Sequence, residues 1–286
     1  MPILYILILA LIQGLAELLP VSSSAHVVVA EKLLGLDPSS PTMTLLLVML
    51  HTGTMFAVIV YFWSQWRDAY FQSMDAFKRF AGFLFLATVL TGLIGEAVIN
   101  AIEKIFFRNV AHAEIEDLFG HLELIVPALA LVGILILIAG IVEKRNTKRE
   151  ANDLNARQAG IIGAVQGLCL PFRGFSRSGA TISTGMLLGA AKARVEMFSF
   201  ALAVVLTPIV VAREVARVVH SEHTNGTAGL ASAVFPYLLG AVFAFLAGLF
   251  ALKWLSRWLE GGRWYLFGVY CLIAAAVVGY LHRLGY

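Results

Sequence analysis

Hydrophobic residues dominate this 286-residue chain, and they gather into apolar runs of two lengths. A helix needs roughly 20 apolar residues to cross the hydrocarbon core of a bilayer. Six runs reach that length, at roughly residues 43–66, 80–99, 122–142, 195–213, 231–252 and 264–282. Four runs are too short, at roughly residues 3–19, 22–35, 157–170 and 178–191. The pattern therefore predicts six transmembrane helices and four shorter apolar helices.

The four short runs form two pairs, and each pair flanks a serine-rich segment. The two segments read alike: QGLAELLPVSSSAH at 13–26 and QGLCLPFRGFSRSGAT at 166–181. Proline disfavours helix at the residue before it, and a serine after it can cap the next helix. Irregular backbone at membrane depth is tolerated only where protein or water surrounds it. We therefore predict two re-entrant helix–loop–helix hairpins, at about 3–35 and 158–191, whose tips lie inside the protein.

Each half of the chain then consists of one hairpin followed by three spans. The first repeat covers 1–142, the second covers 158–286, and residues 143–157 link them. Because three is odd, the second half must sit upside down relative to the first. We expect an all-α polytopic membrane protein of two inverted repeats, an arrangement that places a binding site where the repeats meet. It should be one structural unit, since neither half buries its tip alone.

The distribution of basic residues predicts the orientation. Of the 21 lysines and arginines, 13 lie in loops and ends on one side of the predicted topology, 6 lie on the other, and Arg173 and Arg177 lie at a hairpin tip. Cytoplasmic loops carry the excess of positive charge. The linker 143–157 should therefore be cytoplasmic, with both termini on the opposite, periplasmic side.

Composition agrees with a membrane protein and excludes other classes. Only 14% of the residues are charged, against about 25% in soluble domains. The net charge of +3 is small and no basic stripe stands beside aromatics, so we expect no nucleic-acid partner. The two cysteines, Cys169 and Cys271, lie in apolar segments and imply no disulfide framework.

The first hairpin carries a group of polar side chains that the bilayer would disfavour. Gln13 and Glu17 are four residues apart and share a helix face, and an acid inside a membrane segment suggests function. The alternative is a carboxylate that is merely paired or reaches the interface. One of the serines 22–24 should cap a helix, but three hydroxyls followed by His26 suggest a nucleophile with an acid–base partner.

The second hairpin carries the signature of an anion site. Guanidinium groups bind phosphate in a bidentate manner, and the N–H groups at a helix start face the same anion. The candidate residues are Arg173, Gly174, Ser176, Arg177, Ser178, Gly179 and Thr181. The competing interpretation is an internal salt bridge between Arg177 and Glu17, which would not exclude phosphate binding. His51, on a predicted span, is a further candidate for lining the site.

Small residues recur at four-residue spacing in the second hairpin. They are Gly163, Gly167, Gly185 and Gly189. We interpret this stripe as close helix packing.

At these residues the chain resembles the undecaprenyl-pyrophosphate phosphatase family of bacterial inner membranes, the bacitracin-resistance proteins. The first family motif is met by Gln13, Glu17, Pro20, Ser22, Ser23 and His26, and the second by Gly174, Ser176, Arg177, Ser178 and Thr181. Two departures stand out: Arg173 replaces a usual proline, and Ala25 replaces a common glycine. The resemblance extends over the whole chain.

The resemblance implies a phosphatase that converts undecaprenyl pyrophosphate into undecaprenyl phosphate at the outer face of the membrane, for reuse in cell-wall synthesis. It implies Ser23 as nucleophile, His26 and Glu17 as acid–base and orienting partners, and Arg177 as the pyrophosphate clamp. Substrate contacts are expected from Gln13, Ser22, Ser24, Arg173, Gly174, Ser176, Ser178 and Thr181. Mg²⁺ or Ca²⁺ is the expected activator, with Glu17 as its ligand, and a homodimer is left open.

Two alternatives stay open from the residues. A water molecule activated by Glu17 and His26 could attack in place of Ser23. A transporter or flippase of polyprenyl phosphate, or of a small anion, would share the inverted-repeat architecture but would have no use for a nucleophile.

Overall fold

A computed structural model describes residues 2–285 except 39, 107–120, 146–152 and 223–229; the side chains of 41, 42, 210 and 213–234 are also outside the description. The described residues contain ten helices and no β-strand, which confirms the all-α prediction. The helices are α1 (Ile3–Leu18), α2 (Ser23–Leu33), α3 (Pro41–Tyr70), α4 (Met74–Phe106), α5 (Leu122–Arg145), α6 (Ala156–Cys169), α7 (Arg177–Leu187), α8 (Lys192–Glu222), α9 (Leu230–Glu260) and α10 (Tyr265–Arg283).

The four short helices form where the sequence predicted them. Helix α1 ends because Leu19, which precedes Pro20, is extended, with φ −82° and ψ 150°. Serine caps open both helices that follow a tip: the hydroxyl of Ser22 accepts from the N–H of Ala25, and that of Ser176 from the N–H of Gly179. The predicted capping role of the tip serines is thus confirmed.

The long helices match the predicted spans. Five of them are long and apolar enough to cross a membrane: Met43–Tyr70, Met74–Ile105, Leu122–Arg145, Phe235–Glu260 and Tyr265–Arg283. Each continues past the apolar run that predicted it, because polar residues at the ends extend the helix. The sixth predicted span, 195–213, coincides with α8, a helix of 31 residues whose C-terminal part lies outside the described side chains.

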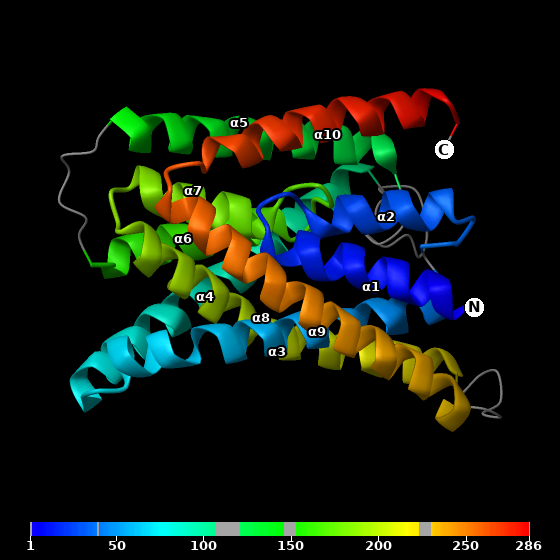
Figure 1. Ribbon diagram of the computed structural model, residues 1–286, viewed down its shortest axis with the longest axis horizontal. Helices are drawn as coiled ribbons and strands as arrows, with labels where there is room; N and C mark the ends of the chain where they lie inside the picture. The colour runs from blue at the N-terminus through cyan, green and yellow to red at the C-terminus, as the bar shows by residue number, and fades with distance from the viewer. Residues whose placement is uncertain (1, 39, 107–120, 146–152, 223–229, 286) are drawn as a thin grey trace.

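The helices are arranged so that each hairpin packs against the other half of the chain. Helix α6 of the second hairpin lies along α4, and α1 of the first hairpin lies along α9. Helices α5 and α10 lie side by side over both hairpins (Figure 1). In the same view, α1 and α2 extend from the centre toward the end where both termini lie, and α6 and α7 extend toward the opposite end.

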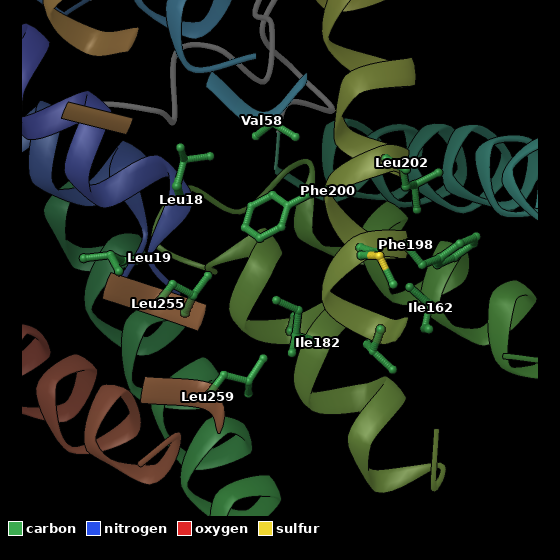
Figure 2. Packing of buried hydrophobic residues seen from close by; sticks show 14 of the residues in the cluster. Leu18, Leu19, Val58, Ile162, Ile182, Phe198, Phe200, Leu202, Leu255 and Leu259 are labelled. Carbon is green, nitrogen blue, oxygen red and sulfur yellow. The ribbon is translucent and has the colours of Figure 1, made fainter. Parts of the chain in front are cut away.

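The largest hydrophobic cluster lies around and beneath the two tips. Figure 2 shows Leu18 and Leu19 of the first hairpin in this cluster, together with Phe200 of α8, Ile182 of α7 and Leu255 of α9. Phe200 and its neighbour in the cluster, Phe198, are fully buried. The polar tips are therefore held in place by a shared apolar core to which both halves contribute.

Glycines let the hairpins approach the long helices closely, as the glycine stripe predicted. A Cβ atom at Gly163 would lie 2.4 Å from the carbonyl oxygen of Ala87 in α4, and one at Gly167 would lie 2.7 Å from that of Thr91. Gly185 packs against the side chain of Val195 in α8, with no backbone atom among its nearest contacts. Gly189 has a different role: its φ of 84° lies in the left-handed region, just past the end of α7. Both cysteines are free and buried, as expected.

Substituting Gly163 with alanine should destabilise the protein, because the added methyl group meets the backbone of α4. We expect a loss on the order of 2 kcal/mol, typical of overpacking. Gly92→Ala, on α4 where a Cβ atom meets nothing within 4 Å, is the matched control and should be neutral or stabilising by up to about 1 kcal/mol. Unfolding of both variants in the same detergent measures the difference. Equal stabilities would contradict the close α4–α6 contact.

Candidate active site

The two serine-rich tips touch each other in the middle of the protein. The hydroxyl of Ser24 accepts a hydrogen bond from the N–H of Gly174 at 3.3 Å, across 150 residues of sequence. In the other direction, the hydroxyl of Ser178 donates to the carbonyl of Leu19 at 3.3 Å. Residues that the sequence placed on separate hairpins therefore belong to one site.

Glu17 is at the centre of this site. One carboxylate oxygen, Oε1, accepts from Nη2 of Arg177 at 2.7 Å. The other, Oε2, accepts from the hydroxyl of Ser23 at 2.5 Å and from Nε2 of Gln13 at 3.1 Å. The side chain is only 14% exposed. The ion pair between Arg177 and Glu17, which was the competing interpretation of the second hairpin, is present, and the carboxylate is held by both tips at once.

One nitrogen of the Arg177 guanidinium has no hydrogen-bond acceptor among the described residues. Its Nη2 is bonded to Glu17, but its buried Nη1 has no hydrogen-bond partner among the described residues. A buried donor without a partner costs about 1–3 kcal/mol, and more when it is charged. Such a group needs a hydrogen-bond acceptor from outside the protein, which water or an anion can supply. One edge of the guanidinium therefore holds the first tip, while the other is available to an anion.

The first turn of α7, which begins at Arg177, is fixed by its own polar side chains. Ser176 caps it, and the hydroxyl of Thr181 donates to the carbonyl of Arg177 at 2.8 Å and lies 2.6 Å from the hydroxyl of Ser199 in α8. Ser176 and Thr181 are buried. In this structure they support the helix start, so the N-terminal end of α7 and Arg177 face the first tip in a fixed position.

Gly174 lets the second tip turn sharply despite the arginine that precedes it. Its φ is 101°, and a Cβ atom there would lie 2.7 Å from the carbonyl oxygen of Ile125 in α5. Only glycine suits both conditions. Arg173 is half-buried beside it. The turn therefore forms with Arg173 in place of the family's usual proline.

The first tip contains a strained residue. Ser22 has φ 67° and ψ 91°, and it is the one non-glycine among the described residues with positive φ. Such a conformation costs of order 1–3 kcal/mol and often accompanies a functional site. Its hydroxyl lies 3.3 Å from that of Ser24, and its carbonyl oxygen lies 2.7 Å from Nδ1 of His26. The strain therefore directs the Ser22 carbonyl onto the histidine ring.

His26 is held by two partners, neither of which is Ser23. A carbonyl only accepts, so Nδ1 carries the hydrogen and donates to Ser22, and the other ring nitrogen, Nε2, accepts from the hydroxyl of Tyr270 at 2.7 Å. The two rings also stack, with centroids 5.6 Å apart. The expected Ser23–His26 pairing is thus not formed here, because the Ser22 carbonyl and Tyr270 occupy both nitrogens. The partner of Ser23 is Glu17.

Tyr270 and His51 contact the site residues His26 and Glu17, although both lie outside the two serine-rich segments of the sequence. Tyr270 belongs to α10 and stands in an apolar run that gave no signal of function. His51, on α3, places Nε2 at 3.6 Å from Oε2 of Glu17, next to the group it was a candidate to join. Periodicity alone could not have identified Tyr270, because its role depends on how α10 packs over the first tip.

A divalent cation at this site would need ligands from substrate phosphates and water in addition to those of the protein. No group of three or more His, Cys, Asp or Glu residues gathers among the described residues, so the protein offers no complete cage there. Mg²⁺ is commonly bound by one or two carboxylates together with substrate phosphates and water. Glu17 is the carboxylate that the two tips enclose, and both of its oxygens already accept hydrogen bonds from Arg177, Ser23 and Gln13.

Comparison with known proteins agrees with these features. The chain matches the family described as "Bacitracin resistance protein BacA" over residues 6–277. It is 57% identical over 281 residues to "Undecaprenyl-diphosphatase 2" of Acinetobacter baylyi, covering 97% of each chain. It is 31% identical to "Undecaprenyl-diphosphatase" of Parabacteroides distasonis, covering 95% of each. The match extends through both hairpins and all the long helices, and the chain therefore belongs to the bacitracin resistance protein BacA family.

Proposed function

We infer that this protein is a membrane phosphatase that hydrolyses undecaprenyl diphosphate to undecaprenyl phosphate and inorganic phosphate. The central observation is the group formed by Glu17, Ser23 and Arg177: a carboxylate on a serine hydroxyl, beside a guanidinium with one free edge. Family membership and the names of two relatives supply the substrate class. This activity accounts for the family's association with bacitracin resistance.

Substrate binding is the task of Arg177 and the start of α7. The diphosphate would occupy the free edge of the guanidinium, where a charge-assisted contact replaces the missing partner of Nη1. The partial positive charge at the N-terminus of α7 favours the same anion. Ser24 and Gly174, which join the tips, would hold the two sides of the site together around the phosphates. The polyprenyl tail would lie along the apolar surface of the bundle, which explains why a phosphate reaction takes place in a membrane protein.

In the reaction, the hydroxyl of Ser23 would attack the terminal phosphorus while Oε2 of Glu17 takes its proton. The bond from that phosphorus to the bridging oxygen breaks, and the electron pair leaves with undecaprenyl phosphate. Water then hydrolyses the phosphoserine, and the proton on Glu17 returns to Ser23. Glu17 is the residue that would hold a divalent cation, which would supply positive charge to offset that of the phosphates. His26 would fix the strained turn at Ser22, and thereby the position of Ser23, with Tyr270 holding its ring.

Orientation in the membrane follows from the packing and the charges. The contact of α4 with α6 has a counterpart in the contact of α9 with α1, as expected for two halves related by a pseudo-two-fold axis. Both termini lie at one end of the molecule, and the α3–α4 turn lies at the other (Figure 1). With 13 of 21 basic residues assigned to one side, we propose inverted repeats in the bacterial inner membrane, with both termini and the opening of the site on the periplasmic side.

The activity and the nucleophile are tested together by phosphate release from undecaprenyl diphosphate in detergent. The wild-type protein should release phosphate without a second compartment, which a transporter would not do. Ser23→Ala should lose turnover but keep substrate affinity, because only a transition-state interaction is removed. Ser22→Ala should cost much less, near the roughly 1 kcal/mol of a helix cap, and Ser24→Ala should cost about as much, near the roughly 1 kcal/mol of one hydrogen bond between the tips.

Similar, small losses at all three serines would remove Ser23 as nucleophile and leave water as the attacking group. Absence of phosphate release from the wild-type protein would contradict the phosphatase itself and favour transport.

Engineered cysteines test the orientation. Cysteines at positions 2 and 284, near the two ends, should react with an impermeant thiol reagent in intact spheroplasts, whereas one at 193, beside Lys192 and Arg194, should be protected until the membrane is opened. The native cysteines are buried and give little background. Labelling of position 193 with protection of 2 and 284 would reverse the proposed orientation, and opposite exposure of 2 and 284 would contradict the inverted repeats.

A further inference from the structure

We propose that a basic hollow, where α3 ends and α4 and α8 begin, binds the headgroup phosphate of an anionic phospholipid. The lining of this hollow includes Arg79 of α4, Arg194 of α8, Tyr70 of α3, Phe83 of α4 and Asp153 from the segment before α6. It shares no residue with the two tips, and no step of the proposed reaction uses it. The hollow is therefore a second binding site, separate from the one that holds the diphosphate.

The hollow lies at the level where two long helices leave the hydrocarbon of the membrane. The apolar stretch of α3 that is long enough to span a membrane ends at Tyr70, and that of α4 begins at Met74. The turn between them lies at the end of the molecule opposite the two termini, which is cytoplasmic in the proposed orientation (Figure 1). Basic pockets between transmembrane helices on that side typically bind anionic headgroups. The position of the hollow therefore suits a lipid headgroup.

Arg194 is held in the hollow by its neighbours. Its Nε lies 3.0 Å from Oδ1 of Asp153, and its guanidinium carbon lies 5.7 Å from the centre of the Tyr70 ring. Tyr70 in turn stacks on the buried ring of Phe80, with the two centroids 3.8 Å apart. A side chain that is already ordered loses less conformational entropy when a ligand binds. Arg194 is therefore pre-organised to receive an anion.

Arg79 gives the hollow a positive charge that its lining does not neutralise. It is exposed, and it makes no hydrogen bond or ion pair with the described residues. Asp153 is the one acid in the lining and is paired with Arg194, so two arginines and one aspartate leave a net charge of +1. A phosphodiester carries one negative charge, and guanidinium groups bind its oxygens through charge-assisted hydrogen bonds. Such a phosphate would join α4 of the first half of the chain to α8 of the second.

Apolar side chains in and beside the hollow favour a lipid over a soluble phosphate. Phe83 lines it one turn further along α4 from Arg79, on the side of the hydrocarbon. At the turn itself, the rings of Phe71 and Phe77 are 49% and 40% exposed and lie 5.4 Å apart. Aromatic residues gather at the boundary between membrane and water. A molecule with a charged head and apolar tails would contact both the arginines and these rings, whereas a soluble phosphate would contact the arginines alone.

Native mass spectrometry of the purified protein in neutral detergent, with phosphatidylglycerol added, measures the Kd of the bound lipid without a charged membrane surface. Arg79→Gln is the main variant, because Arg79 makes no contact in the protein whose loss would unfold it, and Arg194→Gln is the second. Arg67→Gln is the matched control, since Arg67 is exposed at the same end of α3, pairs with Asp68 and lies outside the hollow. The comparison probes are phosphatidylcholine, which has the same phosphodiester but no net charge, and inorganic phosphate. Thermal unfolding in lipid-free detergent checks that every variant is folded.

We expect the wild-type protein to bind phosphatidylglycerol on the order of 10-fold more tightly than phosphatidylcholine, as for one charge-assisted contact. Arg79→Gln and Arg194→Gln should each weaken the binding of phosphatidylglycerol by about 10-fold, whereas Arg67→Gln should stay within about two-fold of the wild type.

Three results would overturn the proposal. Equal affinity for the two lipids would contradict recognition of the charge. Equal weakening by Arg67→Gln and Arg79→Gln would show a basic surface without a defined site. Displacement of phosphatidylglycerol by inorganic phosphate would assign the hollow to a soluble anion and not to a lipid.

Discussion

The ion pair between Glu17 and Arg177 is the interaction on which the rest of this structure depends. It joins two residues 160 positions apart, each on a short helix that ends or begins inside the protein. A buried charge without a partner costs several kcal/mol, so neither tip is stable at this depth without the other. The exchange of contacts between halves follows from the same constraint, because each hairpin must reach the opposite half to meet its counter-charge.

The two tips are alike in sequence but complementary in chemistry. Both begin with Gln-Gly-Leu and both glutamines are fully buried, yet Gln13 donates to the carboxylate of Glu17, whereas Gln166 donates to the hydroxyl of Thr91 in α4. The first tip supplies the acid and the serine, and the second supplies the arginine. A single tip duplicated unchanged could not form this site, since two acids or two cations would repel each other. The acid and the cation of the central ion pair therefore come from different hairpins.

Much of this architecture was predictable from the chain alone, because the bilayer restricts which structures can form. Run length distinguished the long helices from the hairpins, and the polar residues inside apolar sequence identified Glu17 and Arg177. Of the two partners expected for Ser23, Glu17 contacts it and His26 does not, because the positive φ of Ser22 turns the carbonyl of that residue toward the His26 ring. Tyr270 was missed for a related reason. Its contact with His26 comes from the packing of α10, and a tyrosine in an apolar span carries no pattern of its own.

The helix caps follow from the local sequence, whereas the roles of the glycines depend on the helices that pack against them. A serine cap after each proline was predictable, whereas the structure identifies the capping residues as Ser22 and Ser176. Gly163 and Gly189 have the same spacing in the stripe, yet one contacts α4 and the other terminates α7 with positive φ. Only the surrounding helices distinguish these two uses of glycine, so a periodic pattern predicts the kind of packing but not every member of it.

A double-mutant cycle on the central ion pair tests this account most directly. Glu17→Gln, Arg177→Gln and the double variant are unfolded in the same mixed micelles, without ligand, and their free energies of unfolding are compared. The side chains of Glu17 and Arg177 are 14% and 21% exposed. We therefore expect each single variant to lower the free energy of unfolding by somewhat less than the roughly 3–5 kcal/mol that follows from breaking a fully buried ion pair. The free energy of unfolding of the double variant should fall by clearly less than the sum of the two single losses, with a coupling energy on the order of 2 kcal/mol. Additive losses would contradict the claim that this ion pair holds the two hairpins together.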